Sequence, residues 1–153
     1  MAENLRLARL YMVILAIVTS ARWGMSLFGV PYERGTDKVS IVIVTLFSSL
    51  FYAAFCRRWL GFQILPAVGL AMTFGVASQL VVLLSTVVSY LFGIHTYFDY
   101  PTALNQSAAV TFGSALGIRL GGLVLNTLTN GIAGAVGWAL GGLLPPSKER
   151  TAE

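Results

Sequence analysis

The chain has 153 residues, of which 56% are hydrophobic and only 10% are charged, and its formal net charge is +4. Because a typical soluble domain has about 25% charged residues, this composition excludes a separate water-soluble domain. The apolar residues come in long runs, and a helix needs about 20 apolar residues to cross a bilayer. The sequence therefore predicts an all-α integral membrane protein. We expect one transmembrane domain over residues 1–153, folded as a four-helix bundle with short loops and a glycine-rich last helix.

The first two predicted spans are bounded by basic residues. Residues 10–30 form an apolar run of sufficient length if Arg22 is tolerated inside the span. Residues 39–56 follow, and they end at Arg57 and Arg58, which together form a charge stop at the membrane surface. Spanning helices are expected because backbone N–H and C=O groups find no water in lipid.

The third predicted span, residues 62–92, is longer than a perpendicular helix requires, so we expect it to be tilted. The apolar segment that follows, residues 108–144, would reach about 55 Å as one helix. We favour an interfacial lead-in at 108–117 followed by a fourth span at 118–144. Two alternatives stay open: a single long helix, or a span at 108–128, a turn at Asn130-Gly131 and a half-helix at 132–144.

Basic residues near the span ends predict the orientation, because they collect on the cytoplasmic side. One side of the predicted bundle would hold six of them: Arg6, Arg9, Arg57, Arg58, Lys148 and Arg150. The other side would hold Arg34 and Lys38, next to the acidic residues Glu33 and Asp37. We expect both termini in the cytoplasm and the protein in a cell membrane, either a plasma membrane or a bacterial inner membrane.

The sequence has few groups that carry chemistry. It contains no Walker loop, no dinucleotide-binding glycine fingerprint and no zinc-ligand spacing. Cys56 is the only cysteine and His95 the only histidine, so we expect no catalytic set, no metal site and no cofactor. The basic residues form no stripe interleaved with aromatics, which argues against nucleic-acid binding. An enzyme would have to rely on His95 with Asp99, near the outer leaflet.

Small and polar residues follow helical spacing in the predicted spans. Positions i, i+4 and i+7 share one helix face, and Ser, Thr and Gln on such faces ordinarily form hydrogen bonds between membrane helices. Glycines repeat every four residues at Gly113, Gly117 and Gly121, and again at Gly137 and Gly141. Because such spacing lets helix backbones approach closely, we expect these glycines to pack against helices of the same bundle, a second copy or another subunit.

Two arginines lie inside apolar segments. A centrally placed arginine costs about 2.5–3.5 kcal/mol on insertion scales, and no acidic residue lies within a predicted span. Arg22 and Arg119 should lie at similar depth in the outer half of the bilayer, where each reaches the headgroups, contacts a loop or binds an anion. Asn126 and Asn130 share a helix face with Arg119. These four residues form the predicted site for an anion or a lipid headgroup.

Three functions remain. The first is a non-enzymatic subunit or scaffold that packs against other membrane helices, and we favour it because catalytic groups are scarce. The alternative is a carrier or channel for an anionic or lipid-like solute, with the arginines as its binding groups. The second alternative is a lipid-modifying membrane enzyme. The expected partners are the lipid bilayer, anionic lipid, and other membrane subunits or a homo-oligomer.

Overall fold

The structure is a computed structural model that describes residues 2–30 and 40–145, with side chains from residue 8 onward. Every element in this part of the chain is helical. The elements are α1 (Ala2–Leu27), α2 (Ile41–Leu60), α3 (Ile64–Phe92), the 3-10 helix η1 (Pro101–Leu104) and α4 (Phe112–Gly141). All four α-helices are long and apolar enough to cross a membrane, which confirms the predicted four-helix, all-α bundle.

The basic pair of α2 lies inside the helix instead of ending it. α2 continues through Arg57 and Arg58 to Leu60 and stops where Gly61 adopts a left-handed conformation, with φ of 68°. α3 ends in the same way at Gly93, with φ of 62°. Glycine tolerates this conformation because it has no Cβ. A glycine therefore ends both α2 and α3. The two arginines occupy the last turn of α2, where positive charge is favourable.

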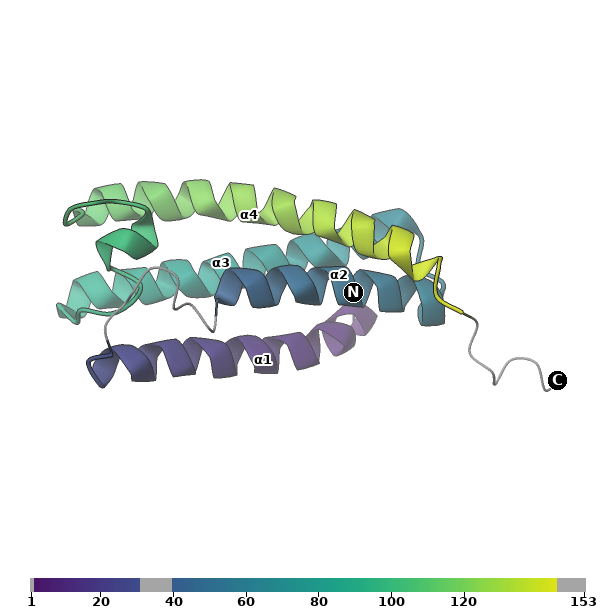
Figure 1. Ribbon diagram of the computed structural model, residues 1–153, viewed down its shortest axis with the longest axis horizontal. Helices are drawn as coiled ribbons and strands as arrows, with labels where there is room; N and C mark the ends of the chain where they lie inside the picture. The colour runs from purple at the N-terminus through teal and green to yellow at the C-terminus, as the bar shows by residue number, and fades with distance from the viewer. Residues whose placement is uncertain (1, 31–39, 146–153) are drawn as a thin grey trace.

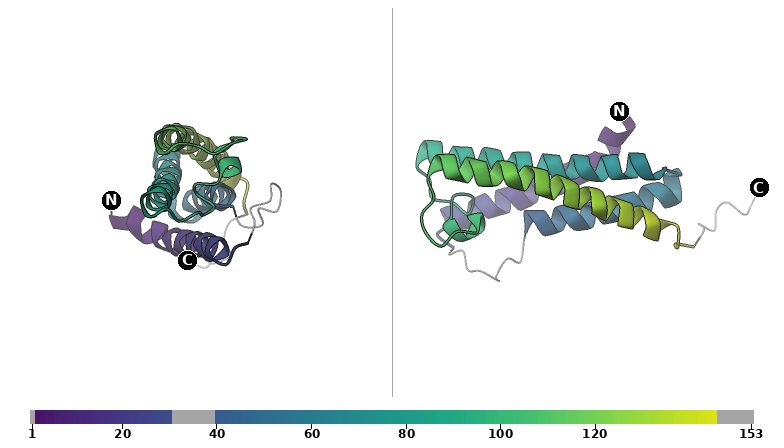
Figure 2. Two further views of the ribbon diagram at one scale, coloured as in Figure 1. Left: turned by 90° about the vertical axis from the view of Figure 1, so that its left-hand side faces the viewer. Right: turned by 90° about the horizontal axis from the view of Figure 1, so that it is seen from above.

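α2, α3 and α4 form the closely packed part of the bundle, and α1 lies against α2 and α3 (Figure 1). Viewed end-on, α1 lies on the side opposite α4 (Figure 2), and within the described residues these two helices are not in contact. Tyr11 fixes α1 in this position. Its ring stacks on Phe74 at a centroid distance of 4.2 Å, and its hydroxyl lies 2.9 Å from the Thr45 hydroxyl.

Glycines bring the second half of α4 against its neighbours. A Cβ at Gly137 would overlap the backbone of Leu50 in α2, and a Cβ at Gly141 would overlap the backbone of Ala54 one turn further along. A Cβ at Gly134 would overlap the side chain of Ala71 in α3. The helix backbones therefore approach more closely than any larger residue would allow, which is the arrangement that small residues four positions apart permit.

The last helix is continuous, which corrects the favoured division into a lead-in at 108–117 and a span at 118–144, and also excludes a turn at Asn130-Gly131. Asn130 is 1% exposed. Its Nδ2 donates to the Asn126 carbonyl at 2.8 Å, and its Oδ1 accepts a hydrogen bond from Ser49 at 2.7 Å. An Asn-Gly pair favours a turn by local preference. Here the buried side-chain hydrogen bonds outweigh that preference and keep the pair helical.

Two arginines of α2 hold the end of α4. Arg57 donates from Nη1 to the Trp138 carbonyl at 2.8 Å, and its guanidinium lies 3.8 Å from the centre of the Trp138 ring. Arg58 donates to the Pro145 carbonyl at 3.0 Å. The last carbonyls of a helix have no partner within the helix, and cations nearby are favourable. The basic pair of α2 therefore caps a neighbouring helix.

Candidate functional site

α2 is shorter than its neighbours α3 and α4, and this leaves room at one end of the bundle. It has 20 residues, whereas α3 has 29 and α4 has 30. Figure 1 shows that α2 begins well inside the bundle while α3 and α4 continue past it. The loop at residues 93–111 folds over this end, with Phe98 and Leu104 buried. We refer to this end of the bundle as the loop end.

The loop is held by its own polar side chains. Asp99 accepts a hydrogen bond from the Thr96 backbone N–H at 2.6 Å, and its other oxygen lies 3.0 Å from Nδ1 of His95. The Thr96 hydroxyl lies 2.6 Å from the Ser89 hydroxyl of α3. The His95 side chain is 96% exposed. His95 and Asp99, the residues on which an enzyme would have to rely, thus form a turn at the surface of the loop.

Both arginines of the apolar segments reach this loop. Arg119, from α4, donates to the Phe98 carbonyl at 2.9 Å and to the Thr86 hydroxyl at 3.1 Å. Arg22, from α1, is only 5% exposed, and its guanidinium lies 4.2 Å from the centre of the Tyr97 ring. The two side chains therefore contact adjacent residues of one loop, with a carbonyl as one partner and an aromatic ring as the other.

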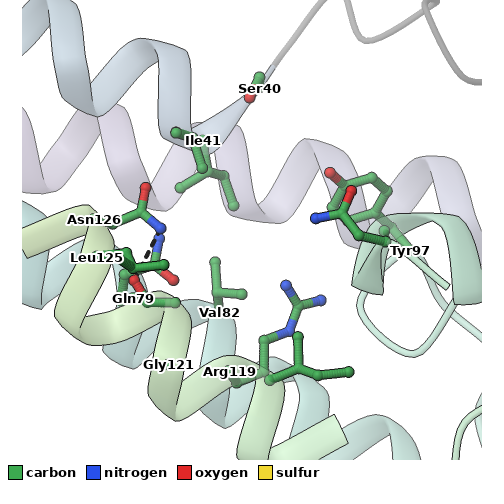
Figure 3. A pocket seen from close by; sticks show the side chains of 14 residues that line it. Ser40, Ile41, Gln79, Val82, Tyr97, Arg119, Gly121, Leu125 and Asn126 are labelled. Carbon is green, nitrogen blue, oxygen red and sulfur yellow. Dashed lines mark hydrogen bonds between the residues drawn. The ribbon is translucent and has the colours of Figure 1, made fainter. Parts of the chain in front are cut away.

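A cavity of about 400 Å³ lies beneath the loop, between the beginning of α2 and the middle of α4. Arg119 extends into it from α4, as Figure 3 shows. Tyr97 forms part of the wall on the loop side. The other residues that line it include two side-chain amides, Gln79 and Asn126, and the apolar residues Ile41 and Val82. The cavity thus combines a positive charge, hydrogen-bonding amides and apolar walls.

Gln79 is the clearest polar feature of the cavity. It lies in α3, is 5% exposed, and has no hydrogen-bond partner for its side-chain amide among the described residues. Its Oε1 lies close to α4, where a Cβ at Gly122 would be 3.6 Å away. Its side chain lines the cavity. An amide in this position is therefore available to a ligand in the cavity.

The beginning of α2 supplies further donors to the cavity. Ser40, Ile41 and Val42 line it, and Ser40 is the N-cap, whose hydroxyl accepts from the Ile43 N–H at 3.4 Å. The first N–H groups of a helix have no partner within the helix, and this end carries a partial positive charge. The α2 N-terminus and the Arg119 guanidinium thus both make the cavity favourable for an anion.

The cavity ends inside the bundle. Asn126 lies at its inner end and donates from Nδ2 to the Gly122 carbonyl at 2.9 Å. One turn further along α4, Asn130 is buried and bonded to Ser49. The close backbone contact of α4 with α2 at Gly137 follows. The polar face of α4 therefore lines a cavity at the loop end. In the second half of α4, the same face packs against other helices.

The structure separates the four residues predicted to bind an anion. Arg119 and Asn126 line the cavity. Asn130 lies one turn beyond the cavity and is hydrogen-bonded to protein groups. Arg22 lies against Tyr97 and does not line the cavity. A glutamine in a predicted span ordinarily bonds a neighbouring helix, so the sequence does not predict Gln79 as a site residue. That Gln79 is buried without a partner among the described residues can be known only from the tertiary structure. No local sequence signal distinguishes this residue from other membrane glutamines.

The two groups of glycines on α4 have different surroundings. Gly137 and Gly141 are buried against α2. At Gly113, Gly117 and Gly121 a Cβ would meet nothing within 4 Å. The first group therefore packs within the bundle, and the second lies on a face that the described part of the chain leaves uncovered.

No protein-family model, curated protein or solved structure matches this chain. Among the described residues there is also no group of His, Cys, Asp or Glu side chains that could hold a metal ion. The fold and the site define a class: a protein with four membrane-length helices and a polar cavity at one end of the bundle. What the cavity does follows from its geometry.

Proposed function

We propose that the protein binds an anionic group inside the membrane, and that Arg119, Gln79 and Asn126 hold this group. The observation that carries the proposal is the amide of Gln79, which is 95% buried in the cavity wall without a hydrogen-bond partner among the described residues. An anionic ligand in the cavity would complete the hydrogen bonding of this amide. Arg119 and the beginning of α2 select an anion for that role.

The form of the cavity supports a binding site more than a pore. A channel needs a continuous polar path, whereas the glycine contacts of Gly137 and Gly141 bring α4 into backbone contact with α2 beyond the cavity. A carrier would have to separate α4 from α2 along that contact. We therefore propose a binding protein in place of the channel among the expected functions.

Ligand-dependent stabilisation tests the proposal. Cys56 is the single cysteine and is fully buried, so a thiol-reactive dye reports unfolding of the purified chain in a maltoside detergent. The probes are phosphatidylglycerol and glycerol 3-phosphate. A bound probe should stabilise the wild type by about 2.7 kcal/mol at 100 times its Kd.

The informative variant is Gln79→Met, which keeps the size of the side chain and removes the amide. It should melt at or above the wild-type temperature without probe, because an unpaired amide has gone, and should bind the effective probe at least tenfold more weakly, as expected for about 1.5–3 kcal/mol from a hydrogen bond to a charged group. Gln63→Met is the control, since Gln63 is exposed at the opposite end. A wild type stabilised by neither probe, or equal binding by Gln79→Met, would contradict the proposal.

A second candidate function is that of a subunit that packs against another membrane helix. The specific observation is the uncovered face of Gly113, Gly117 and Gly121, because small residues at this spacing favour close helix contacts. Gly117→Leu should abolish association between copies, or with a co-purifying subunit, in crosslinking and detergent sizing. Leu123→Ile on the same helix should have no effect. An unchanged assembly for Gly117→Leu removes this candidate.

A further inference from the structure

We infer that the anionic group is carried by a membrane lipid, which enters the cavity sideways between the beginning of α2 and the middle of α4. This inference rests on the function proposed above and identifies the class of its ligand. Three features carry it: the place of the opening, the apolar side chains at its edge and the glycine face of α4 beside it.

The opening exists because α3 and α4 extend past the first residue of α2 at the loop end. Ile41 and Val42, the first residues of α2, line the cavity together with Leu125 and Asn126 of α4. From Asn126 back to Phe112, α4 continues for about 21 Å at 1.5 Å per residue. Figure 1 shows this part of α4 running past the start of α2. The cavity therefore lies where α4 extends beyond the first turn of α2. This position is on the side of the bundle.

The edge of the opening is apolar and faces outward. Val42 is 44% exposed and Leu125 is 66% exposed, and both line the cavity. On a bundle of membrane-spanning helices, exposed apolar side chains at this depth face lipid tails. The path inward leads from these residues to Arg119, Gln79 and the α2 N-terminus. A ligand that matches this path has a charged head and an apolar tail, which is the character of a lipid anion.

The glycine face of α4 gives such a ligand room. Gly121 lines the cavity, and Gly117 and Gly113 follow at successive turns, each with open space where a Cβ would be. A surface made of backbone alone allows a glycerol unit or an acyl chain to lie directly against the helix. Gly121 therefore borders the lateral opening, and Gly117 and Gly113 continue the same uncovered face away from it.

The phosphate of a lipid and a free phosphate ester share the chemistry that Arg119 and the helix N-terminus recognise. The two sources differ in the apolar tail, and so the test must separate them. Phosphatidylglycerol serves as the lipid anion and glycerol 3-phosphate as its water-soluble fragment, with binding read from the melting shift of the full chain in detergent. The wild type should bind phosphatidylglycerol at least tenfold more tightly than glycerol 3-phosphate.

The variant Gly121→Leu narrows the lateral opening. A Cβ at Gly121 meets nothing within 4 Å, so we expect the fold to accept the substitution, and the melting temperature without probe checks this. It should weaken phosphatidylglycerol binding at least tenfold and leave the affinity for glycerol 3-phosphate unchanged. Gly113→Leu is the matched control: the same substitution, on the same face of α4, at a residue that does not line the cavity. It should retain phosphatidylglycerol as the wild type does.

The outcomes distinguish this inference from the proposed function. If glycerol 3-phosphate binds as tightly as phosphatidylglycerol, or if Gly121→Leu keeps full lipid affinity, the ligand does not enter from the lipid side. The inference then fails while the anion site stands. If neither probe stabilises the wild type, the proposed function fails and the inference fails with it.

Discussion

The guanidinium of Arg22 lies 4.2 Å from the centre of the Tyr97 ring, and Tyr97 forms part of the cavity wall. α1 has no contact with α4 within the described residues, yet it reaches the cavity through this pair. A second contact supports the arrangement, because the Tyr97 backbone N–H donates to the Ser26 hydroxyl at 2.9 Å. α1 thus positions a wall of a site that α3 and α4 supply with polar groups.

The Arg22–Tyr97 contact should appear as a coupling energy in a double-mutant cycle. A desolvated cation–π pair is worth about 2 kcal/mol, so Arg22→Gln and Tyr97→Leu should together destabilise the protein by less than the sum of their separate effects. The difference should be about 1–2 kcal/mol in detergent melting experiments. Arg9→Gln, which removes the same charge from an exposed position of α1, is the control. Strict additivity would show that the contact contributes no stability.

Glycines on the two halves of α4 should respond in opposite directions to alanine. Gly137→Ala places a methyl group on the backbone of Leu50, and such overpacking costs about 1–3 kcal/mol or more. Gly117→Ala meets only open space and should stabilise the helix by about 0.5–1 kcal/mol. Melting temperatures of the two variants check this directly. A tolerated Gly137→Ala would mean that α2 and α4 are further apart than the structure places them.

Arg57 should resist replacement by lysine, although the charge is kept. Its planar guanidinium lies on the Trp138 ring while it donates to the Trp138 carbonyl, and an ammonium cannot reproduce that geometry. We expect Arg57→Lys to lower the free energy of unfolding by about 1–2 kcal/mol. Arg58→Lys, at a neighbouring site without a ring contact, should have a smaller effect. Equal effects would show that charge alone holds the end of α4.

The orientation predicted from the basic residues can be tested at two exposed glutamines on opposite ends of the bundle. Gln106 lies at the loop end and Gln63 at the other end. In intact cells, a membrane-impermeant maleimide should label Gln106→Cys, and Gln63→Cys only after permeabilisation. The wild type is the control, since Cys56 is fully buried. The reverse pattern would place the cavity on the cytoplasmic side.

The helices could be predicted from the sequence because their apolar runs are near or above the length that a bilayer requires. The continuity of α4 could not, because the turn preference of Asn130-Gly131 is local while the hydrogen bond that overrides it comes from Ser49, 81 residues away in the chain. Arg119 and Asn126 could be proposed as site residues because polar groups are rare in such runs. The cavity itself depends on where α2 begins relative to α4, and helix lengths alone do not fix that register.

The sparse contacts of α1 also bear on how the chain is made. Arg22 contacts Tyr97, which lies 75 residues later in the chain. At a synthesis rate of 5–20 residues per second, Tyr97 is synthesised roughly 4–15 s after Arg22. During that interval the first helix resides in the bilayer with its native aromatic contact unmade. Nascent chains that end before Tyr97 should therefore release α1 to urea or alkaline extraction more readily than chains that extend beyond it.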